Sequence, residues 1–202
     1  MQNGISLQLI NNSNEPNSIT VLIFQKNNST EYDLAVAWRV IWHLAQGNRY
    51  PFVFSDDLLV SASDSWGNFT PQFAVRPGQA YEMVRAESGD VLKPYPQGAS
   101  NPEEIDVLNG LGQGAINASI YRSGELLAAK TDIVPGQKAS FAFEPTIFLG
   151  VVSEMLPGQI IRPSILPELS EISLLGIQSA DIVITGGVSA PYKFTLENVV
   201  QA

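Results

Sequence analysis

The chain has a single histidine, His43, and no cysteine, so few side chains could act as a nucleophile, a general base or a soft metal ligand. A Ser-His-Asp mechanism needs a base oriented by a carboxylate and a nucleophile on a sharp turn. The sequence has no Gly-x-Ser-x-Gly motif that would supply such a turn. A zinc site built on one histidine would need three carboxylates, and no spacing in the chain suggests one. We therefore expect no catalytic residue, no cofactor and no enzyme.

Paired carboxylates could still do acid–base chemistry of the glycosidase kind. The two adjacent pairs, Asp56–Asp57 and Glu103–Glu104, would point in opposite directions on a strand because side chains alternate between faces. We interpret them as solvated loop charges, and a carboxylate-based enzyme stays open as a minor alternative.

His43 lies in the segment DLAVAWRVIWHL, residues 33–44, which also holds two of the three tryptophans. Strand alternation places one set of side chains on an apolar face: Leu34, Val36, Trp38, Val40 and Trp42. The other face then carries Ala35, Ala37, Arg39, Ile41 and His43. The pattern favours a core strand with a solvated back. The alternatives are a ligand site at Arg39 and His43 and a protein interface formed by Trp38 and Trp42.

A second site-like stretch runs from Asp56 to Thr70. Calcium binds clustered carboxylate, amide and carbonyl oxygens, so Asp56, Asp57, Asp64 and Asn68 are candidate calcium ligands. Trp66 beside a glycine in a polar loop could stack on a sugar ring, with Asp64 and Asn68 as polar partners. The same residues also make a good β-turn, which is the simplest interpretation.

Charge and composition narrow the class of partner. The 202 residues carry a net charge of −9 and only 15% are charged, with basic residues scattered singly. Nucleic acid and anionic membranes need a positive surface, so neither is expected as a partner. Sparse charge leaves room for an extensive protein contact, and self-association is a fair expectation. No long apolar run predicts a transmembrane segment, and the N-terminus lacks signal-peptide features, so we expect a cytoplasmic protein.

Short runs of β-branched and aromatic residues fill the chain between Gly, Pro, Asn and Asp punctuation, and helical periodicity is nearly absent. Strands at this spacing predict an all-β fold, an antiparallel β-sandwich with little or no helix. Three Pro-Gly-Gln tripeptides, at residues 77–79, 135–137 and 157–159, predict type II turns.

Two series of strands resemble each other in order and character. Residues 18–26 resemble 115–123, residues 33–37 resemble 125–129, and residues 47–55 resemble 136–144. We therefore predict two similar β-sandwich halves, residues 1–95 and 103–202, joined by a linker at 96–102. The alternatives are chance likeness among strands and one intertwined domain over residues 1–202.

These observations favour a non-catalytic β-sandwich protein that acts by protein–protein interaction or self-assembly, as a homo-oligomer or with another protein. Residues 1–13 are a plausible exchange or edge strand. Two alternatives remain: a lectin-like carbohydrate-binding protein that uses the Trp66 loop, and a membrane-active β protein of the pore-forming type, which would need an exposed aromatic patch.

Overall fold

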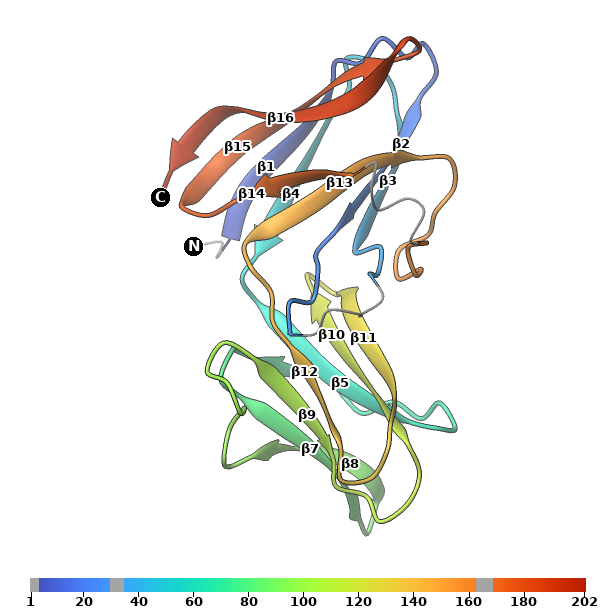
Figure 1. Cartoon of the computed structure of the whole chain (residues 1–202), viewed down its shortest axis with the longest axis vertical. Helices are drawn as coiled ribbons and strands as arrows, with labels where there is room; N and C mark the ends of the chain where they lie inside the picture. The colour runs from blue at the N-terminus through green and yellow to red at the C-terminus, as the bar shows by residue number, and fades with distance from the viewer. Residues whose placement is uncertain (1–3, 30–34, 163–168) are drawn as a thin grey trace. The chain divides into compact units, whose positions relative to one another are not determined.

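The computed structural model describes residues 4–29, 35–162 and 169–202, and these ranges contain sixteen β-strands and no helix (Figure 1). The strands form four sheets of four strands each, and most neighbours are antiparallel. The predicted all-β, sandwich-like class is confirmed. Within the described ranges there is no helix that could span a membrane.

Contacts divide the chain into two compact units. Unit 1 contains residues 1–25, 35–56 and 145–202, and unit 2 contains residues 26–34 and 57–144. The chain therefore passes between the units four times, at residues 25/26, 34/35, 56/57 and 144/145, and residues 57–144 supply most of unit 2.

Unit 1 has two sheets, with strand orders β16-β15-β1-β4 and β14-β13-β2-β3. β1 runs parallel to β15, and the other neighbouring strands are antiparallel. The strands are β1 (Gly4–Asn11), β2 (Ile19–Phe24), β3 (Arg39–Leu44), β4 (Arg49–Ser55), β13 (Thr146–Val152), β14 (Ser170–Ser173), β15 (Ile177–Gly187) and β16 (Ala190–Gln201).

Unit 2 also has two sheets, with strand orders β12-β9-β7-β8 and β11-β10-β5-β6. Here β7 and β9 form the parallel pair. The strands are β5 (Leu58–Asp64), β6 (Phe73–Val75), β7 (Ala80–Ala86), β8 (Gly89–Tyr95), β9 (Ile105–Asn109), β10 (Ile116–Arg122), β11 (Glu125–Ile133) and β12 (Lys138–Phe141).

The two units share one strand order and one set of pairing directions. β1 to β4 of unit 1 correspond to β9 to β12 of unit 2, and β13 to β16 correspond to β5 to β8. The register agrees as well, since Ile10 pairs with Arg49 in unit 1 as Leu108 pairs with Lys138 in unit 2. This likeness supports the predicted duplication, which itself stays a prediction.

Each predicted half of the sequence contributes strands to both units. Residues 1–95 supply β1 to β4 to unit 1 and β5 to β8 to unit 2. The predicted linker at 96–102 lies inside unit 2, where the Ala99 amide donates to the Gly78 carbonyl at 2.9 Å. The contacts thus divide the chain at residues 25/26, 34/35, 56/57 and 144/145 rather than at this connection.

A buried asparagine holds the corner where β1 ends. Asn11 has no exposed surface; its Nδ2 donates to the Leu44 carbonyl at 2.8 Å, and its Oδ1 accepts from the Ser13 amide at 3.0 Å. The Gly47 amide donates to the Asn11 carbonyl at 2.7 Å. Buried backbone groups need partners, and here one side chain supplies two of them.

Asn109 does the same work at the end of β9 and is equally buried. Its Nδ2 donates to the Ile133 carbonyl at 2.7 Å and to the Gly114 carbonyl at 2.9 Å, while its Oδ1 accepts from the Leu111 amide at 3.0 Å. The Gly136 amide donates to the Asn109 carbonyl at 2.8 Å, as Gly47 does in unit 1. The two corners are built alike.

A bulge precedes each corner. His43 in β3 has φ 55° and Asp132 in β11 has φ 59°, both in the left-handed region. The pairing of β3 with β2 shifts register between Ile19 and Val21, and that of β11 with β10 shifts at the corresponding place. The unusual backbone of His43 is therefore a feature of the fold that a different residue type shares in unit 2.

The N-terminal segment is wrongly predicted as an edge strand. β1 lies between β15 and β4, pairs with both along its length, and buries Leu9 completely. Removing residues 1–13 would remove a central strand of unit 1, so the remaining chain could not keep that unit folded.

The Pro-Gly-Gln tripeptides form the predicted turns. In each the glycine has a positive φ between 78° and 86°, and the glutamine amide donates back to the carbonyl three residues earlier at 3.0–3.1 Å. In two of them the glutamine Oε1 also accepts from that earlier residue's amide: Gln79 from Arg76 and Gln159 from Leu156. These glutamines close turns within the chain.

Candidate functional site

The two tryptophans of residues 33–44 have different environments. Trp38 is fully buried and packs edge-on against Phe54, with ring centroids 5.9 Å apart. Trp42 is 47% exposed, and His43 beside it is exposed as well. The predicted alternation breaks next to Trp38, because Ala37 and Val40 share one buried cluster with Leu22 and Phe24 whereas Trp38 packs against Phe54. Trp38 is thus a core residue, and only Trp42 can contact a partner.

The start of the strand and the position of Arg39 also differ from the prediction for this segment. The strand begins at Arg39 rather than near residue 32, and residues 33–34 lie outside the described ranges. The Arg39 guanidinium lies 4.9 Å from the ring centroid of Trp38 and 5.5 Å from that of Phe52. This cation–π position engages Arg39 inside the fold, away from a shared site with His43.

The sheet formed by β14, β13, β2 and β3 is apolar on both faces. Val21 and Ile23 of β2 are buried, and so are the alternating residues Leu22 and Phe24. The Phe24 ring stacks on Phe148 at 5.0 Å. These outer-face side chains form a cluster with Met155 and Ile161 from the connection between β13 and β14. The described part of that connection, residues 153–162, therefore covers the outer face of the sheet.

The corresponding face of unit 2 is more polar and needs no such cover. Ser119 and Tyr121 stand where unit 1 has Leu22 and Phe24, and the Ser61 hydroxyl donates to the Tyr121 hydroxyl at 3.4 Å. The connection from β5 to β6 is short, residues 65–72. The apolar outer face of unit 1 thus lies under a long connection, and the more polar outer face of unit 2 has only a short one.

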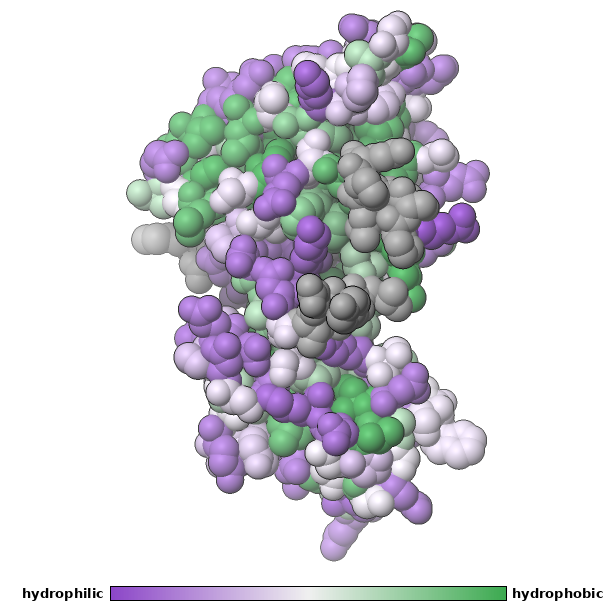
Figure 2. All heavy atoms as spheres, in the orientation of Figure 1, coloured by the Kyte–Doolittle hydropathy of each residue, from purple (hydrophilic) through white to green (hydrophobic). Residues whose placement is uncertain are grey.

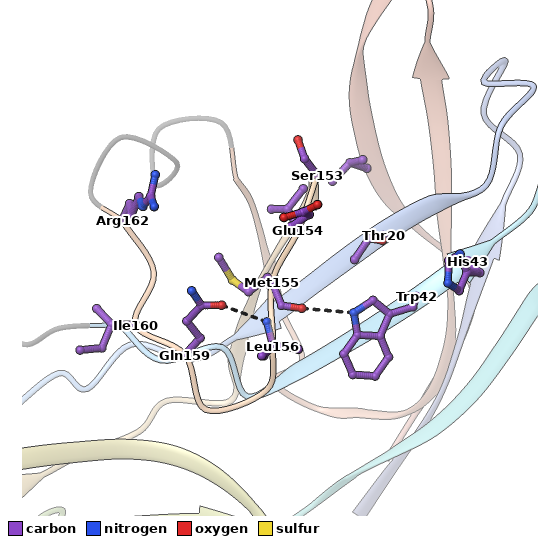
Figure 3. Close-up of a pocket in the computed structure, with 12 residues that line it drawn as sticks. Thr20, Trp42, His43, Ser153, Glu154, Met155, Leu156, Gln159, Ile160 and Arg162 are labelled. Atoms are coloured by element: carbon purple, nitrogen blue, oxygen red, sulfur yellow. Dashed lines mark hydrogen bonds between the residues drawn. The ribbon is translucent and has the colours of Figure 1, made fainter.

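A groove of about 990 Å³ opens where the covering connection meets β2, β3 and β13 (Figure 3). Trp42 and Thr20 contribute from the sheet, and residues 153–162 form the opposite wall. The indole Nε1–H of Trp42 donates to the Met155 carbonyl at 3.1 Å, which fixes the ring. The Gln159 side chain, tied to the Leu156 amide, holds the far turn of the connection (Figure 3).

The lining combines exposed apolar surface with a few polar groups. Leu156 is 65% exposed and Ile160 is 52% exposed, and both line the groove with the half-exposed Trp42, Ile160 at the end away from the ring (Figure 3). The polar groups of the lining are Thr20, His43, Ser153, Glu154, Gln159 and Arg162. An aromatic ring flanked by aliphatic side chains and polar groups can bind a ligand by apolar contact and orient it by hydrogen bonds.

The Trp66 loop joins β5 to β6. Trp66 is 88% exposed and Phe69 is 68% exposed. The Asp64 carboxylate accepts from the Trp66 amide at 2.9 Å and from the Asn68 amide and Nδ2 at 2.9 and 2.7 Å. The hydrogen bonds from Asn68 hold the pKa of Asp64 below its usual value. The loop is therefore ordered by its own side chains.

The four calcium candidates do not come together. Asp56 and Asp57 precede β5 and Asp64 ends it, so the two sets are separated by roughly 20 Å at about 3.3 Å per residue. Both Asp64 oxygens are engaged within the loop, and one of their donors is Asn68. No group of three acidic or histidine side chains suited to a metal ion occurs in the described part of the chain.

A third apolar surface lies at one end of β15 and β16. Leu175 is 76% exposed, and Val199 and Val200 are 39% and 48% exposed. Figure 2 shows apolar side chains gathered at the surface where β14, β15 and β16 lie in Figure 1. This surface is flat and aliphatic, in contrast to the groove beside Trp42.

Comparison with known proteins gives no assignment: no family model matches the chain, and no match was found among curated proteins or solved structures.

Sequence reasoning found Trp42 and missed the opposite wall of the groove. The signal for that wall was the long interval between the apolar run at residues 146–152 and the next strand, interrupted by Pro157-Gly158-Gln159. An apolar residue at every position from Val21 to Phe24 was a second signal, because a sheet that is buried on both faces requires cover.

Proposed function

We propose that this protein is a non-catalytic interaction protein that binds an apolar segment of another protein chain in the groove beside Trp42. The observation that carries the proposal is the Trp42 ring, half exposed and fixed by its bond to the Met155 carbonyl. Tryptophan held in place, with apolar neighbours and a polar surround, is typical of the residues that dominate protein interfaces.

A peptide fits the lining better than a sugar does. Leu156 and Ile160 present aliphatic side chains in the same groove as the ring, and aliphatic surface gains free energy by burial against apolar groups. Covering the exposed half of Trp42, roughly 110 Å², would contribute about 3 kcal/mol at 25 cal/mol per Å². That is enough to make Trp42 the main determinant of affinity.

Selection from a displayed library of random peptides tests the proposal, with the full-length chain as bait. We expect selected peptides that carry an aromatic or large aliphatic residue and bind Trp42→Ala about a hundredfold more weakly, since about 3 kcal/mol corresponds to that factor. Leu156→Asp, at an exposed position, should weaken them without affecting folding. Trp66→Ala is the matched control and should bind normally.

Peptides that bind Trp42→Ala and Leu156→Asp as well as the parent chain would contradict the proposal, and so would a selection that enriches none. Thermal unfolding of each variant, followed by far-ultraviolet circular dichroism, separates lost binding from lost folding.

A second candidate function is carbohydrate binding by the Trp66 loop. It is favoured by the 88% exposure of Trp66 on a loop that the Asp64 bonds hold in shape. Such a ring can stack on a sugar face with little loss of side-chain entropy. A glycan array probed with the parent chain, Trp66→Ala and Trp42→Ala would test it. Binding lost only in Trp66→Ala supports it, and identical profiles for all three chains count against it.

A further inference from the structure

Neither half of the sequence can close a unit by itself. Among the sheet neighbours, β1 pairs with β15 and β2 pairs with β13, so unit 1 closes between residues 1–56 and 145–202. In unit 2, β9 pairs with β7 and β10 pairs with β5. Each of these four pairings joins a strand of the first eight to a strand of the last eight.

The chain is therefore made of two kinds of four-strand block. Blocks of the first kind are β1 to β4 and β9 to β12, and blocks of the second kind are β13 to β16 and β5 to β8. The two kinds alternate along the chain. In unit 2 the blocks β5 to β8 and β9 to β12 are consecutive in the sequence, whereas in unit 1 the blocks β1 to β4 and β13 to β16 are its first and last. The block of residues 145–202 reaches its partner only after the whole of unit 2.

Corresponding backbone hydrogen bonds join the two blocks in each unit. The Asn12 amide donates to the Ile184 carbonyl at 2.9 Å in unit 1, and the Gly110 amide donates to the Met83 carbonyl at 2.9 Å in unit 2. The surfaces that meet are fully buried and apolar, with Leu9 and Ile23 on one block and Leu149 and Ile182 on the other. A block of either kind is thus a complete docking surface for the other kind.

We infer that a second copy of this chain can supply the block of residues 145–202 to residues 1–56, so that the protein self-associates by exchanging these strands. An exchanged pair would make the same contacts as unit 1 of a single chain, and the chain would change course only at the connections between the units, at residues 25/26, 34/35, 56/57 and 144/145. Exchange of identical elements between copies is a low-cost route to dimers. The exchange is independent of the proposed function, because the groove residues and their sheet are intact in either form.

The test uses the absence of cysteine in the native chain. Ser6 of β1 and Ser179 of β15 are neighbours in register, and Ser6 is exposed. Adjacent strands lie about 4.8 Å apart, which suits a disulfide. One chain carries Ser6→Cys and a second, with a longer tag, carries Ser179→Cys. The two are unfolded in urea together, refolded at about 1 µM to 1 mM, and oxidised.

We expect a disulfide-linked product of both chains whose yield rises about in proportion to concentration. Closure within one chain has an effective concentration on the order of 1 mM, so the two forms should be comparable at the upper end of the range. The control pairs Ser65→Cys, exposed on the Trp66 loop, with Ser179→Cys and measures random collision. A single chain with both Ser6→Cys and Ser179→Cys confirms that the pair can be oxidised.

A linked yield at least tenfold above the Ser65→Cys control at about 1 mM supports exchange. A yield equal to that control, in a series where the double variant oxidises fully within one chain, would overturn the inference. Peptide selection at the groove would be unaffected by that outcome, so the two proposals fail separately.

Discussion

Replacing either corner asparagine should destabilise its own unit and leave the other unit unchanged. Asn11→Ala removes two buried hydrogen bonds of 2.8 and 3.0 Å and leaves the Leu44 carbonyl and the Ser13 amide without that partner. At about 1 kcal/mol for each bond, plus the cost of unpaired buried groups, the loss is about 2–4 kcal/mol. Asn109→Ala removes three bonds of 2.7–3.0 Å and should cost about 3–5 kcal/mol.

Hydrogen exchange measured by mass spectrometry on the intact chain locates each loss. In Asn11→Ala we expect amides of β1 to β4 and β13 to β16 to exchange about a hundredfold faster, since about 3 kcal/mol corresponds to that factor. Amides of β5 to β12 should keep their protection. Asn109→Ala should give the complementary pattern, and Asn12→Ala, at an exposed neighbouring position, should change little.

The reasoning would be refuted if Asn11→Ala deprotected β5 to β8 while β13 to β16 stayed protected. That pattern would mean that the first eight strands fold as one unit. A uniform loss over all strands would mean that the two units unfold together, and the assignment of separate units by contacts would then be wrong.

Two further predictions concern single residues in each unit. In unit 2 the buried Asp106 accepts from Lys138 Nζ at 2.6 Å and from the Ser140 hydroxyl at 2.6 Å; burial alone would raise its pKa, but these bonds outweigh burial and lower the pKa below the ordinary 3.8. A lowered folded-state pKa stabilises the fold above the unfolded-state pKa, and this gain disappears as pH falls through the folded-state pKa. Asp106→Asn should therefore cost about 2 kcal/mol at pH 7 and much less near pH 2; urea unfolding at both pH values checks this, and an equal cost at both would contradict it. At the bulges, His43→Gly should raise the midpoint of thermal unfolding, because a left-handed non-glycine residue costs roughly 1–2 kcal/mol, while the greater chain entropy lost by glycine on folding offsets only about 0.5–1 kcal/mol of this gain. Asp132→Gly should gain less, since Asp tolerates this conformation better. A lower midpoint for His43→Gly would show that the backbone of His43 is not strained.

Local features of the fold could be predicted from the sequence because they depend on near neighbours. The Pro-Gly-Gln turns followed from the fixed φ of proline and the freedom of glycine. The strands at 18–26 and 115–122 are close to those observed as β2 and β10. Pro51 and Pro94 stand in β4 and β8, which are edge strands, where a missing amide donor is tolerated.

Pairing between distant strands could not be predicted in the same way. Alternation identifies the face of each side chain and says nothing about which strand lies beside it. β1 and β9 hold corresponding places in the two units, but their parallel partners β15 and β7 come from opposite halves of the chain. For this reason the boundaries of the compact units were invisible to sequence reasoning.

The candidate site could be predicted from the sequence only in part, for a similar reason. Trp42 stood out by composition, but alternation placed it on one face with the buried Trp38, whereas the strand begins only at Arg39, after Trp38. The candidate calcium ligands are close in the sequence, but the extended length of β5 separates them in space. The groove itself depends on residues 153–162 folding back over β2 and β3, a contact that joins segments more than a hundred residues apart.

The split of unit 1 along the chain has a consequence for biosynthesis. Ribosomes add about 5–20 residues per second, and residues 57–144 stand between β4 and β13. Unit 2 is complete when residue 144 has emerged, whereas β1 to β4 wait roughly 7–30 s longer than their own synthesis requires before the whole partner block of residues 145–202 exists. During that interval the apolar strands Ile19–Phe24 and Arg39–Leu44 lack β13 as the neighbour of β2 and are open to chaperones and to neighbouring nascent chains on the same message.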